Sequence, residues 1–349
     1  MVMLLVNVGL DYHLDSIRVC VLAEDGRELV NRNCANSWLA VADLVAQYGY
    51  PKACAVESCC GAADFAEELG QKTGWTVKLA HPGYVRRLKQ SPDKSDHDDA
   101  YLLADLVRVD YLPEVWLAPE ETRELRRLVR FRQQLKRARV EIKQQLRALL
   151  REQRIEAPEA NPWTKAWMKW LQTTTALSAH GRWIVDRQLE RLEAVKKDLA
   201  QVEERLAEAT TDDPLTQQLL EQEGIGPVTA VTLRAEIGRF DRFRSGKQVA
   251  RFCGLSPCNA SSGKRQADAG LVRAGNRELR TVILETAHRL VRTNPRWREL
   301  KQRLKAKKPA SVATAAVANR WIRWLYHQMI TKDSLNEGEA EAAATLATT

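Results

Sequence analysis

The stretch LLVNVGLD, residues 4–11, is an apolar run with the length of one buried β-strand, and it ends in a carboxylate, Asp11. Residues 17–22 form a second short run in front of a turn signal, so the two segments predict a hairpin that opens a sheet. Residues 53–57 predict a further strand, which also ends in a carboxylate, Glu57. The beginning of the chain therefore predicts a sheet with acidic residues at two strand ends.

Helices and one more strand complete this unit. Apolar residues at helical spacing follow Gly61, and residues 75–80 predict another strand. Ser95 or Asp96 is a suitable N-cap for the helix that comes next. The order β-β-β-α-β-α indicates an α/β domain over residues 1–115.

The composition is that of a globular protein with a basic surplus. The chain has 349 residues, a formal net charge of +9, 44% hydrophobic and 28% charged residues, which excludes wholesale disorder. No apolar run reaches the length of about 18 residues that a membrane span needs, and the N-terminus lacks the features of a signal peptide. Seven cysteines without Cys-x-x-Cys spacing indicate a reducing compartment and no zinc site. We therefore expect a cytoplasmic protein without a membrane partner.

The middle of the chain predicts long paired helices. Leucine or isoleucine recurs every seven residues from Leu128 to Leu149, and spacings of three and four run from Leu192 to Leu206. We expect an antiparallel helical hairpin or coiled coil over 116–213, which would also be the element through which copies of the chain dimerise. A tryptophan-rich insert lies at its tip and is expected to belong to a core or an interface rather than to a base-stacking platform.

The last third predicts a compact, mainly helical domain over 214–330 and a disordered tail over 331–349. Gly224 and Gly226 flank Ile225 between two predicted helices, as in a helix-hairpin-helix turn. Backbone N–H groups of such a turn can bind a phosphate, although a plain interhelical turn fits the same residues.

Basic residues are concentrated in two runs. Residues 120–155 hold twelve Lys and Arg against five Asp and Glu, and a second run covers 292–308. Such faces suit the phosphate backbone of a nucleic acid, although a solvated helix face explains either run alone. In the first run we select Arg126, Arg130 and Arg137 as candidates for nucleic-acid binding.

Four carboxylates form a candidate metal site. Asp96 and Asp99 lie three residues apart at the start of a predicted helix and can face the same side. Converging carboxylates repel one another unless a cation lies between them, and oxygen ligands suit Mg²⁺ or Mn²⁺, which assist phosphoryl transfer. Each acid alone also fits a turn or a helix-dipole role, but their joint placement favours the site. Its members are Asp11, Glu57, Asp96 and Asp99.

A second group of chemically capable residues lies in the C-terminal domain. Two serines stand beside a glycine and several cations, a composition that fits a phosphate-binding site or a surface loop. The residues are Ser261, Ser262, Lys264, Arg265, Arg273 and Arg277.

Both groups belong to motifs that resemble one family. VGLD at 8–11, Glu57 after a strand, and KSDHDDA at 94–100 resemble the DEDD-type insertion-sequence transposases. The N-terminal domain of that family is similar to the Holliday-junction resolvase RuvC and has an RNase H-like fold. The order Gly-Leu-x-Pro, Ser-Ser-Gly and a basic Gly-Asn-Arg segment, over 254–277, resembles the C-terminal transposase domain of the same family.

The resemblance implies a DNA recombinase with a covalent phosphoserine intermediate. Ser261 matches the nucleophile of the family, with its neighbour Ser262 as an open alternative, and the four acids match its metal ligands. The family also implies a homo-oligomer, a dimer or tetramer, in which the serine reaches the acids of another copy. A structured guide RNA that pairs with target and donor DNA, and a place in a prokaryotic cell near the nucleoid, follow from the resemblance alone.

Two rival functions remain open. The first is a RuvC-like, metal-dependent junction nuclease that uses water and no covalent serine, and its cleavage would survive the substitution Ser261→Ala. The second is a non-enzymatic nucleic-acid-binding protein that descends from such an enzyme, for which Asp11→Asn would change nothing except metal-linked stability.

Overall fold

The structure is a computed structural model, and it describes residues 4–89, 95–259 and 268–346. The chain divides into two compact units, Met1–Glu120 and Glu121–Thr349, which we describe separately. The finer division into a helical spacer and a C-terminal domain stays a prediction.

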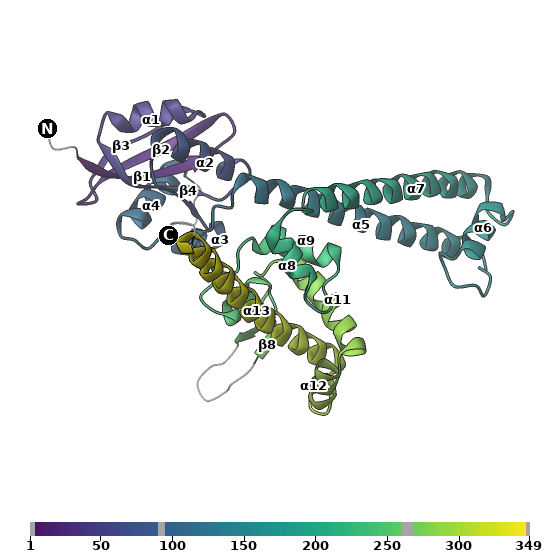
Figure 1. Cartoon of the computed structure of the whole chain (residues 1–349). Helices are drawn as coiled ribbons and strands as arrows, with labels where there is room; N and C mark the ends of the chain where they lie inside the picture. Colours follow the sequence, from purple (N-terminus) through teal and green to yellow (C-terminus); the bar gives the residue numbers. More distant parts are fainter. Residues whose placement is uncertain (1–3, 90–94, 260–267, 347–349) are drawn as a thin grey trace. The chain divides into compact units, whose positions relative to one another are not determined.

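The first unit is built on a six-stranded mixed sheet with the order β3-β2-β1-β4-β5-β6 (Figure 1). The central strand β1 pairs antiparallel with β2 and parallel with β4. The strands are β1 (Leu5–Tyr12), β2 (Ser16–Ala23), β3 (Glu28–Ala35), β4 (Tyr50–Glu57), β5 (Val77–Ala80) and β6 (Glu114–Val115).

Helices cover both faces of this sheet. Apolar residues of α1 and α2 pack on one face, for example Val41 and Phe65 against Val8. The other face packs against α4, whose Ala100 and Ala104 meet β2. The helices are α1 (Trp38–Ala46), α2 (Ala62–Thr73), α3 (Pro82–Leu88) and α4 (Asp96–Arg108).

The sequence predicted most, but not all, of these elements. The expected strands and the helix after Gly61 are present, and Ser95 is the N-cap of α4, since its Oγ accepts a hydrogen bond from the Asp98 N–H. The prediction omitted β3 and α1. The strand β3 lies at the edge of the sheet, and its exposed polar residues hide the period-two alternation by which a strand is recognised.

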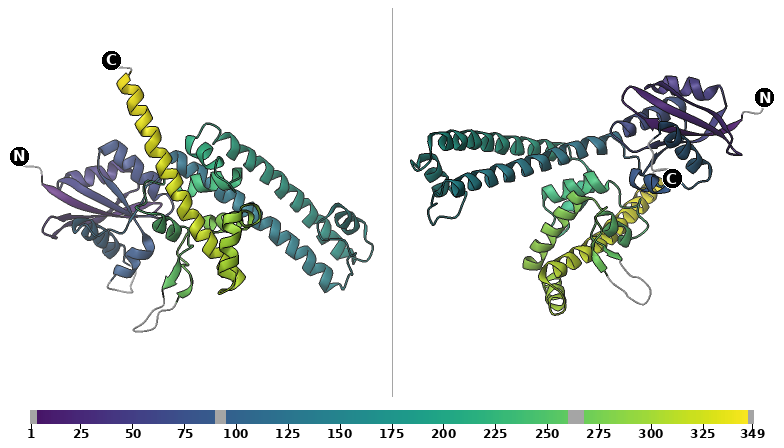
Figure 2. Two further views of the ribbon diagram at one scale, coloured as in Figure 1. Left: turned by 60° about the horizontal axis from the view of Figure 1, so that its bottom comes forward. Right: turned by 180° about the vertical axis from the view of Figure 1, so that it is seen from behind.

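The second unit begins with a long helical hairpin. Helix α5 (Glu120–Glu152) lies along α7 (Ala179–Glu208), and the short α6 (Lys165–Thr173) lies between them in the chain (Figure 2). Ile142, Leu146 and Leu192 are buried in the core at the end of the hairpin that carries α6. Trp167 is buried in the same core, which confirms the core interpretation of the tryptophan cluster.

The rest of the second unit is mainly helical. Its core includes Phe240, Leu279 and Trp321, which are almost completely buried. The helices are α8 (Pro214–Leu220), α9 (Pro227–Ile237), α10 (Gly246–Phe252), α11 (Arg277–Thr293), α12 (Pro295–Lys305) and α13 (Ala310–Leu346), with a two-stranded sheet of β7 (Pro257–Asn259) and β8 (Asp268–Leu271).

The C-terminal helix is longer than the sequence predicted. Helix α13 continues to Leu346, whereas the sequence predicted a disordered tail from residue 331; the alanine and glutamate residues of this segment favour helix formation. Within the described ranges, no helix combines the length and the apolar character required to cross a membrane.

Candidate active site

Two of the predicted acids lie at the same edge of the sheet. Strands β1 and β4 are parallel neighbours, and Leu10 pairs with Val56. The next residue in each strand is therefore a carboxylate, Asp11 beside Glu57, at the carboxyl ends of both strands. The predicted meeting of these two acids follows directly from the strand register.

A glycine brings the third acid to this edge. A Cβ atom on Gly9 would lie 2.1 Å from the carbonyl oxygen of Ala100 and 2.4 Å from the amide nitrogen of Ala104. Only a residue without a side chain allows the backbone of α4 to lie so close to β1. The first turn of α4, with Asp96, consequently lies next to Asp11.

Asp11, His13 and Asp96 form a compact group of possible ligands. One ligand atom from each lies within 4.8 Å of the others. His13 Nε2 is 3.1 Å from Asp11 Oδ2 and 3.6 Å from Asp96 Oδ1. Burial raises the pKa of Asp11 above its ordinary value of 3.8, His13 opposes this change, and the carboxylates of Asp96 and Asp99 raise the pKa further.

The other two acids surround this group without joining it. The Asp99 side chain, which is 10% exposed, forms an ion pair with the ammonium group of Lys89. Burial raises the pKa of the Cys59 thiol, and the nearby charge of Glu57 is the second cause of this rise. The charge of Asp11 also raises it. All four predicted acids therefore lie in one region, but only Asp11 and Asp96 approach each other as ligands would.

The chemistry of this region fits a divalent cation. Carboxylate oxygens are the ligands that Mg²⁺ and Mn²⁺ prefer, and Mn²⁺ also accepts an imidazole nitrogen. Burial and the neighbouring carboxylates raise the pKa of Asp11, and a bound cation would favour its charged form. The sequence analysis missed His13; its one signal was its place two residues after Asp11, which puts both side chains on one side of an extended segment.

Ser261, the predicted nucleophile, lies outside the described residues, together with its neighbours Ser262, Lys264 and Arg265. The structure describes the two strands that flank them. Strands β7 and β8 pair antiparallel through Pro257 with Leu271 and through Asn259 with Asp268. In the sequence, the serines stand between these two strands.

The base of the β7–β8 pair is fixed to the helical core. The Asn276 N–H donates to the Phe252 carbonyl oxygen at 2.9 Å, and the side chain of Asn276 caps α11. A Cβ atom on Gly275 would lie 2.2 Å from the Cα of Gly254, so the chain segments before β7 and after β8 touch through two glycines. Arg273, in the segment after β8, is exposed.

The candidate nucleic-acid-binding arginines of α5 have protein partners. Arg126 donates to the Ala235 carbonyl oxygen at 2.7 Å. Arg130 donates to both carboxylate oxygens of Glu236, at 3.0 and 3.2 Å. Arg137 pairs with Glu278.

Three of the candidate cations nevertheless share one surface pocket of about 370 Å³: Arg130 and Arg137 from α5 and the exposed Arg277 from α11. The pocket also contains the carboxylates of Glu236 and Glu278, so it is not a purely cationic surface.

The predicted glycine turn joins α8 to α9. Gly224 has a φ of +82°, and Gly226 is the N-cap of α9, with Pro227 as the first helical residue. Ile225 between them is buried in the core. The interhelical turn is confirmed, and its binding of phosphate stays a prediction.

Two family models match the chain. A model described as the transposase IS116/IS110/IS902 family matches residues 216–302, and the DEDD transposase model of IS110 matches residues 8–154. The second match implies an RNase H-like fold, in agreement with the mixed sheet and its two helical layers. It also suggests that the enzyme uses a divalent metal.

Curated relatives cover most of the chain. A probable family 20 transposase of Pseudomonas aeruginosa is 30% identical over 282 residues, 78% of this chain and 82% of the relative. The transposase for insertion sequence element IS1111A of Coxiella burnetii is 24% identical over 82% of this chain and 78% of its own length. The transposase for insertion sequence element IS1328 of Yersinia enterocolitica is 28% identical over 77% and 81%. The chain therefore belongs to the IS116/IS110/IS902 family of transposases, which are enzymes that cut and join DNA.

Proposed function

We propose that the chain cuts and rejoins the DNA of an insertion sequence through a covalent phosphoserine intermediate. The acids Asp11, Glu57, Asp96 and Asp99 would hold Mg²⁺ or Mn²⁺, and Ser261 would be the nucleophile. The observation that carries the metal part of the proposal is the approach of Asp11 and Asp96, two like charges held within ligand distance of each other and of His13. The serine part rests on the motif at 254–277.

The acids would act by holding positive charge at the scissile phosphate. A divalent ion, when bound, neutralises the charge that develops on the phosphoryl oxygens. Asp11 on β1 and Asp96 on α4 lie on regular elements of the fold, which would limit the rearrangement that these ligands need. His13, which contacts both carboxylates, is a candidate ligand or a group that orients them.

The serine step exchanges one phosphoester bond for another. The Ser261 Oγ–P bond forms while the bond between phosphorus and one deoxyribose oxygen breaks. The serine hydroxyl loses its proton, and the departing oxygen gains one. A serine hydroxyl is a weak nucleophile and needs such assistance. Reversal of the step with a different strand end joins DNA without a further energy source.

We further propose that Lys264, Arg265, Arg273 and Arg277 bind DNA phosphates beside the serine. We also propose that the enzyme works as a dimer or tetramer on target and donor DNA, guided by a structured RNA of its own element. These last features rest on the family resemblance.

The experiment that tests the proposal is a denaturing gel for a protein–DNA adduct. Full-length protein is incubated with labelled DNA of the element, Mg²⁺ and RNA transcribed from its non-coding end. We expect an adduct with the wild type and none with Ser261→Ala or Asp96→Asn. Nicked DNA from wild type and Ser261→Ala alike would show a nuclease that uses water, and loss of the adduct in Ser262→Ala alone would move the nucleophile by one residue. Binding without any cleavage would favour the non-enzymatic alternative.

A mixture of two inactive variants tests whether the site is composite. Suppose that the serine of one copy acts with the acids of another. A dimer of one Ser261→Ala copy and one Asp96→Asn copy then has one working site, which combines the intact serine of the second copy with the intact acids of the first. We then expect roughly a quarter of the wild-type adduct after random exchange of subunits. No adduct from the mixture would show that serine and acids act within one copy.

A further inference from the structure

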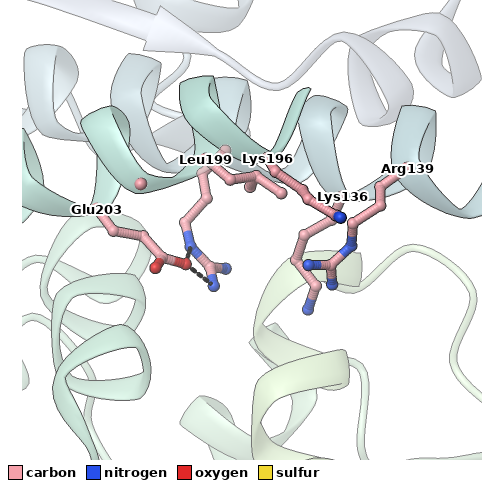
Figure 3. A pocket seen from close by; sticks show the side chains of 7 residues that line it. Lys136, Arg139, Lys196, Leu199 and Glu203 are labelled. Carbon is pink, nitrogen blue, oxygen red and sulfur yellow. Dashed lines mark hydrogen bonds and ion pairs between the residues drawn. The ribbon is translucent and has the colours of Figure 1, made fainter. Parts of the chain in front are cut away.

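The groove between α5 and α7 contains a pocket in which cationic side chains from both helices meet. The pocket has a volume of about 190 Å³, and its lining shares no residue with the predicted acid site or with the predicted serine site. Figure 3 shows Lys136, Arg139 and Lys196 gathered at one end of it. Glu203 lies at the other end, where it accepts hydrogen bonds from Arg132.

The nearby carboxylates balance these cations only in part, since Lys196 pairs with Glu193 along its own helix. Glu203 accepts two hydrogen bonds from Arg132, at 2.6 and 2.8 Å, so its charge is already matched. Among the described residues, the carboxylate that pairs with Lys136 is that of Glu285, 4.0 Å away. Among the residues that the structure describes, no carboxylate forms an ion pair with Arg139.

The electrostatic cost of this crowding is visible at a neighbouring lysine. Burial lowers the pKa of Lys143, and the positive charges of Arg139 and Lys196 lower it further. Lys196 retains this effect although it pairs with Glu193 at 2.6 Å along its own helix. Facing positions of paired helices usually carry opposite charges, and here like charges face each other across the groove. Such an arrangement costs stability unless an anion binds between the cations.

We propose that this pocket binds the phosphate backbone of a nucleic acid. The inference rests on the proposed function in one respect, that the enzyme acts on DNA or RNA. Arg132, Lys136, Arg139 and Lys143 recur at spacings of four and three residues, so they form a row about 16 Å long on one side of α5. With a rise of about 3.4 Å per nucleotide in one strand, the row spans about five phosphates.

The same surface offers charge and little else to a ligand. The ring of Trp163 is already covered by Lys143, whose Nζ lies 4.8 Å from the ring centre, so it is not open on that face for base stacking. Phosphate contacts without base contacts fix the position of a nucleic acid but do not select a sequence. The pocket is therefore a positioning surface, distinct from the cations beside the serines.

The test compares two triple variants in the full-length Ser261→Ala protein, which cannot form the proposed adduct. The first variant carries Lys136→Gln, Arg139→Gln and Lys196→Gln. The matched control removes three exposed cations of α7 outside the pocket and is Arg187→Gln, Arg191→Gln and Lys197→Gln. Binding is measured by fluorescence anisotropy with a labelled DNA duplex of about 30 base pairs and with an RNA duplex of the same sequence, between about 50 and 200 mM KCl.

We expect the pocket variant to bind at least about tenfold more weakly, with a salt slope lower by about 2 to 3, and the control to change by less than about threefold. Loss with only one of the two duplexes would support the proposal and identify the nucleic acid. Equal losses in both variants, or unchanged binding, would overturn it. A changed sedimentation coefficient of the pocket variant with unchanged binding would also overturn it, in favour of an interface between copies. Because no step depends on the serine, failure here leaves the proposed chemistry untouched.

Discussion

Two groups of carboxylates in this chain have opposite surroundings. In the first unit, Asp11 and Asp96 lie next to each other, and the pKa of Asp11 is raised by burial and by the neighbouring acids. In the second unit, Glu236 is only 2% exposed, but it accepts hydrogen bonds from Arg130 through both oxygens and from the Asn276 amide at 2.8 Å.

The difference separates a binding site from a structural contact. A buried carboxylate that accepts hydrogen bonds through both oxygens stabilises the elements that it joins, here α5, α9 and the start of α11. Carboxylates that face each other without enough cations destabilise the fold, and such an arrangement is typical of a site whose ligand supplies the missing charge. Replacement of a carboxylate by its amide should therefore have opposite consequences at the two places.

The largest expected effect is on DNA cleavage. Asp11→Asn or Asp96→Asn removes a charged metal ligand, and we expect cleavage to fall by roughly 10²–10³-fold, the equivalent of about 3–4 kcal/mol. The free energy of unfolding without metal should stay the same or rise, because the burial of a charge and the repulsion between the acids are relieved. The measurements are a cleavage time course and a chemical unfolding curve in EDTA. An unfolding curve shifted to lower denaturant would contradict the view that these acids repel each other.

The second expected effect concerns the glycine that brings the acids together. Gly9→Ala places a methyl group against the backbone of Ala100, so α4 must move away from β1. We expect the first unit to lose about 2–3 kcal/mol of stability and Asp96 to leave the ligand group. Hydrogen exchange of peptides from β1 and α4 measures the change. The control is Gly70→Ala inside α2, where no clash occurs and stability should stay equal or rise by up to about 1 kcal/mol.

The sequence could locate the acids in the fold because the signals for their positions are local. A strand end marks the positions of Asp11 and Glu57, and an N-cap serine marks the helix start with Asp96. The parallel register of β1 and β4 then brings the first two together. The heptads of the paired helices are equally local, and Ile142 and Leu192 lie in the predicted seam.

Contacts between residues that are far apart in the chain could not be predicted from the sequence. Arg130 was selected for nucleic-acid binding because it belongs to a basic helix, yet its carboxylate partner follows 106 residues later. The pairing of Asp99 with Lys89 was likewise hidden, since it joins α4 to the end of α3. Helix α1 went unnoticed because WLAVADLVA is apolar at almost every position, so no helical period is visible.

The third expected effect tests the structural carboxylate. Glu236→Gln keeps the size of the side chain but weakens charge-assisted hydrogen bonds with Arg130 and Asn276, and we expect a loss of about 2 kcal/mol. Urea unfolding followed by tryptophan fluorescence reports this, since seven of the ten tryptophans lie beyond residue 121. Glu203→Gln, at a more exposed pair with Arg132, should change stability by at most about 0.5 kcal/mol. Equal losses of stability at both positions would contradict the view that the buried Glu236 stabilises the fold more than the exposed Glu203.

The smallest expected effect is a pH dependence whose sign differs between two carboxylates. The raised pKa of Asp11 means that the folded state prefers its protonated form, so its contribution to stability is present below pH 3.8 and is lost as the pH rises through the folded pKa. For Asp213, burial acts to raise the pKa, but hydrogen bonds from Thr216 and Arg234 outweigh burial and lower it. The stability from Asp213 is therefore present above its ordinary pKa and is lost as the pH falls through the lowered one.

The two signs can be separated by calorimetry in EDTA. The melting temperature of Asp11→Asn should match the wild type in acid and exceed it by at most about 2 °C near neutral pH, whereas Asp213→Asn should match in acid and fall below it near neutral pH. If Asp11→Asn lowered the melting temperature at neutral pH, the carboxylate of Asp11 would be stabilised by the fold, as Glu236 is. Asp11 would then be a structural carboxylate, and the proposed difference between acids that bind a ligand and acids that stabilise the fold would be wrong for this residue.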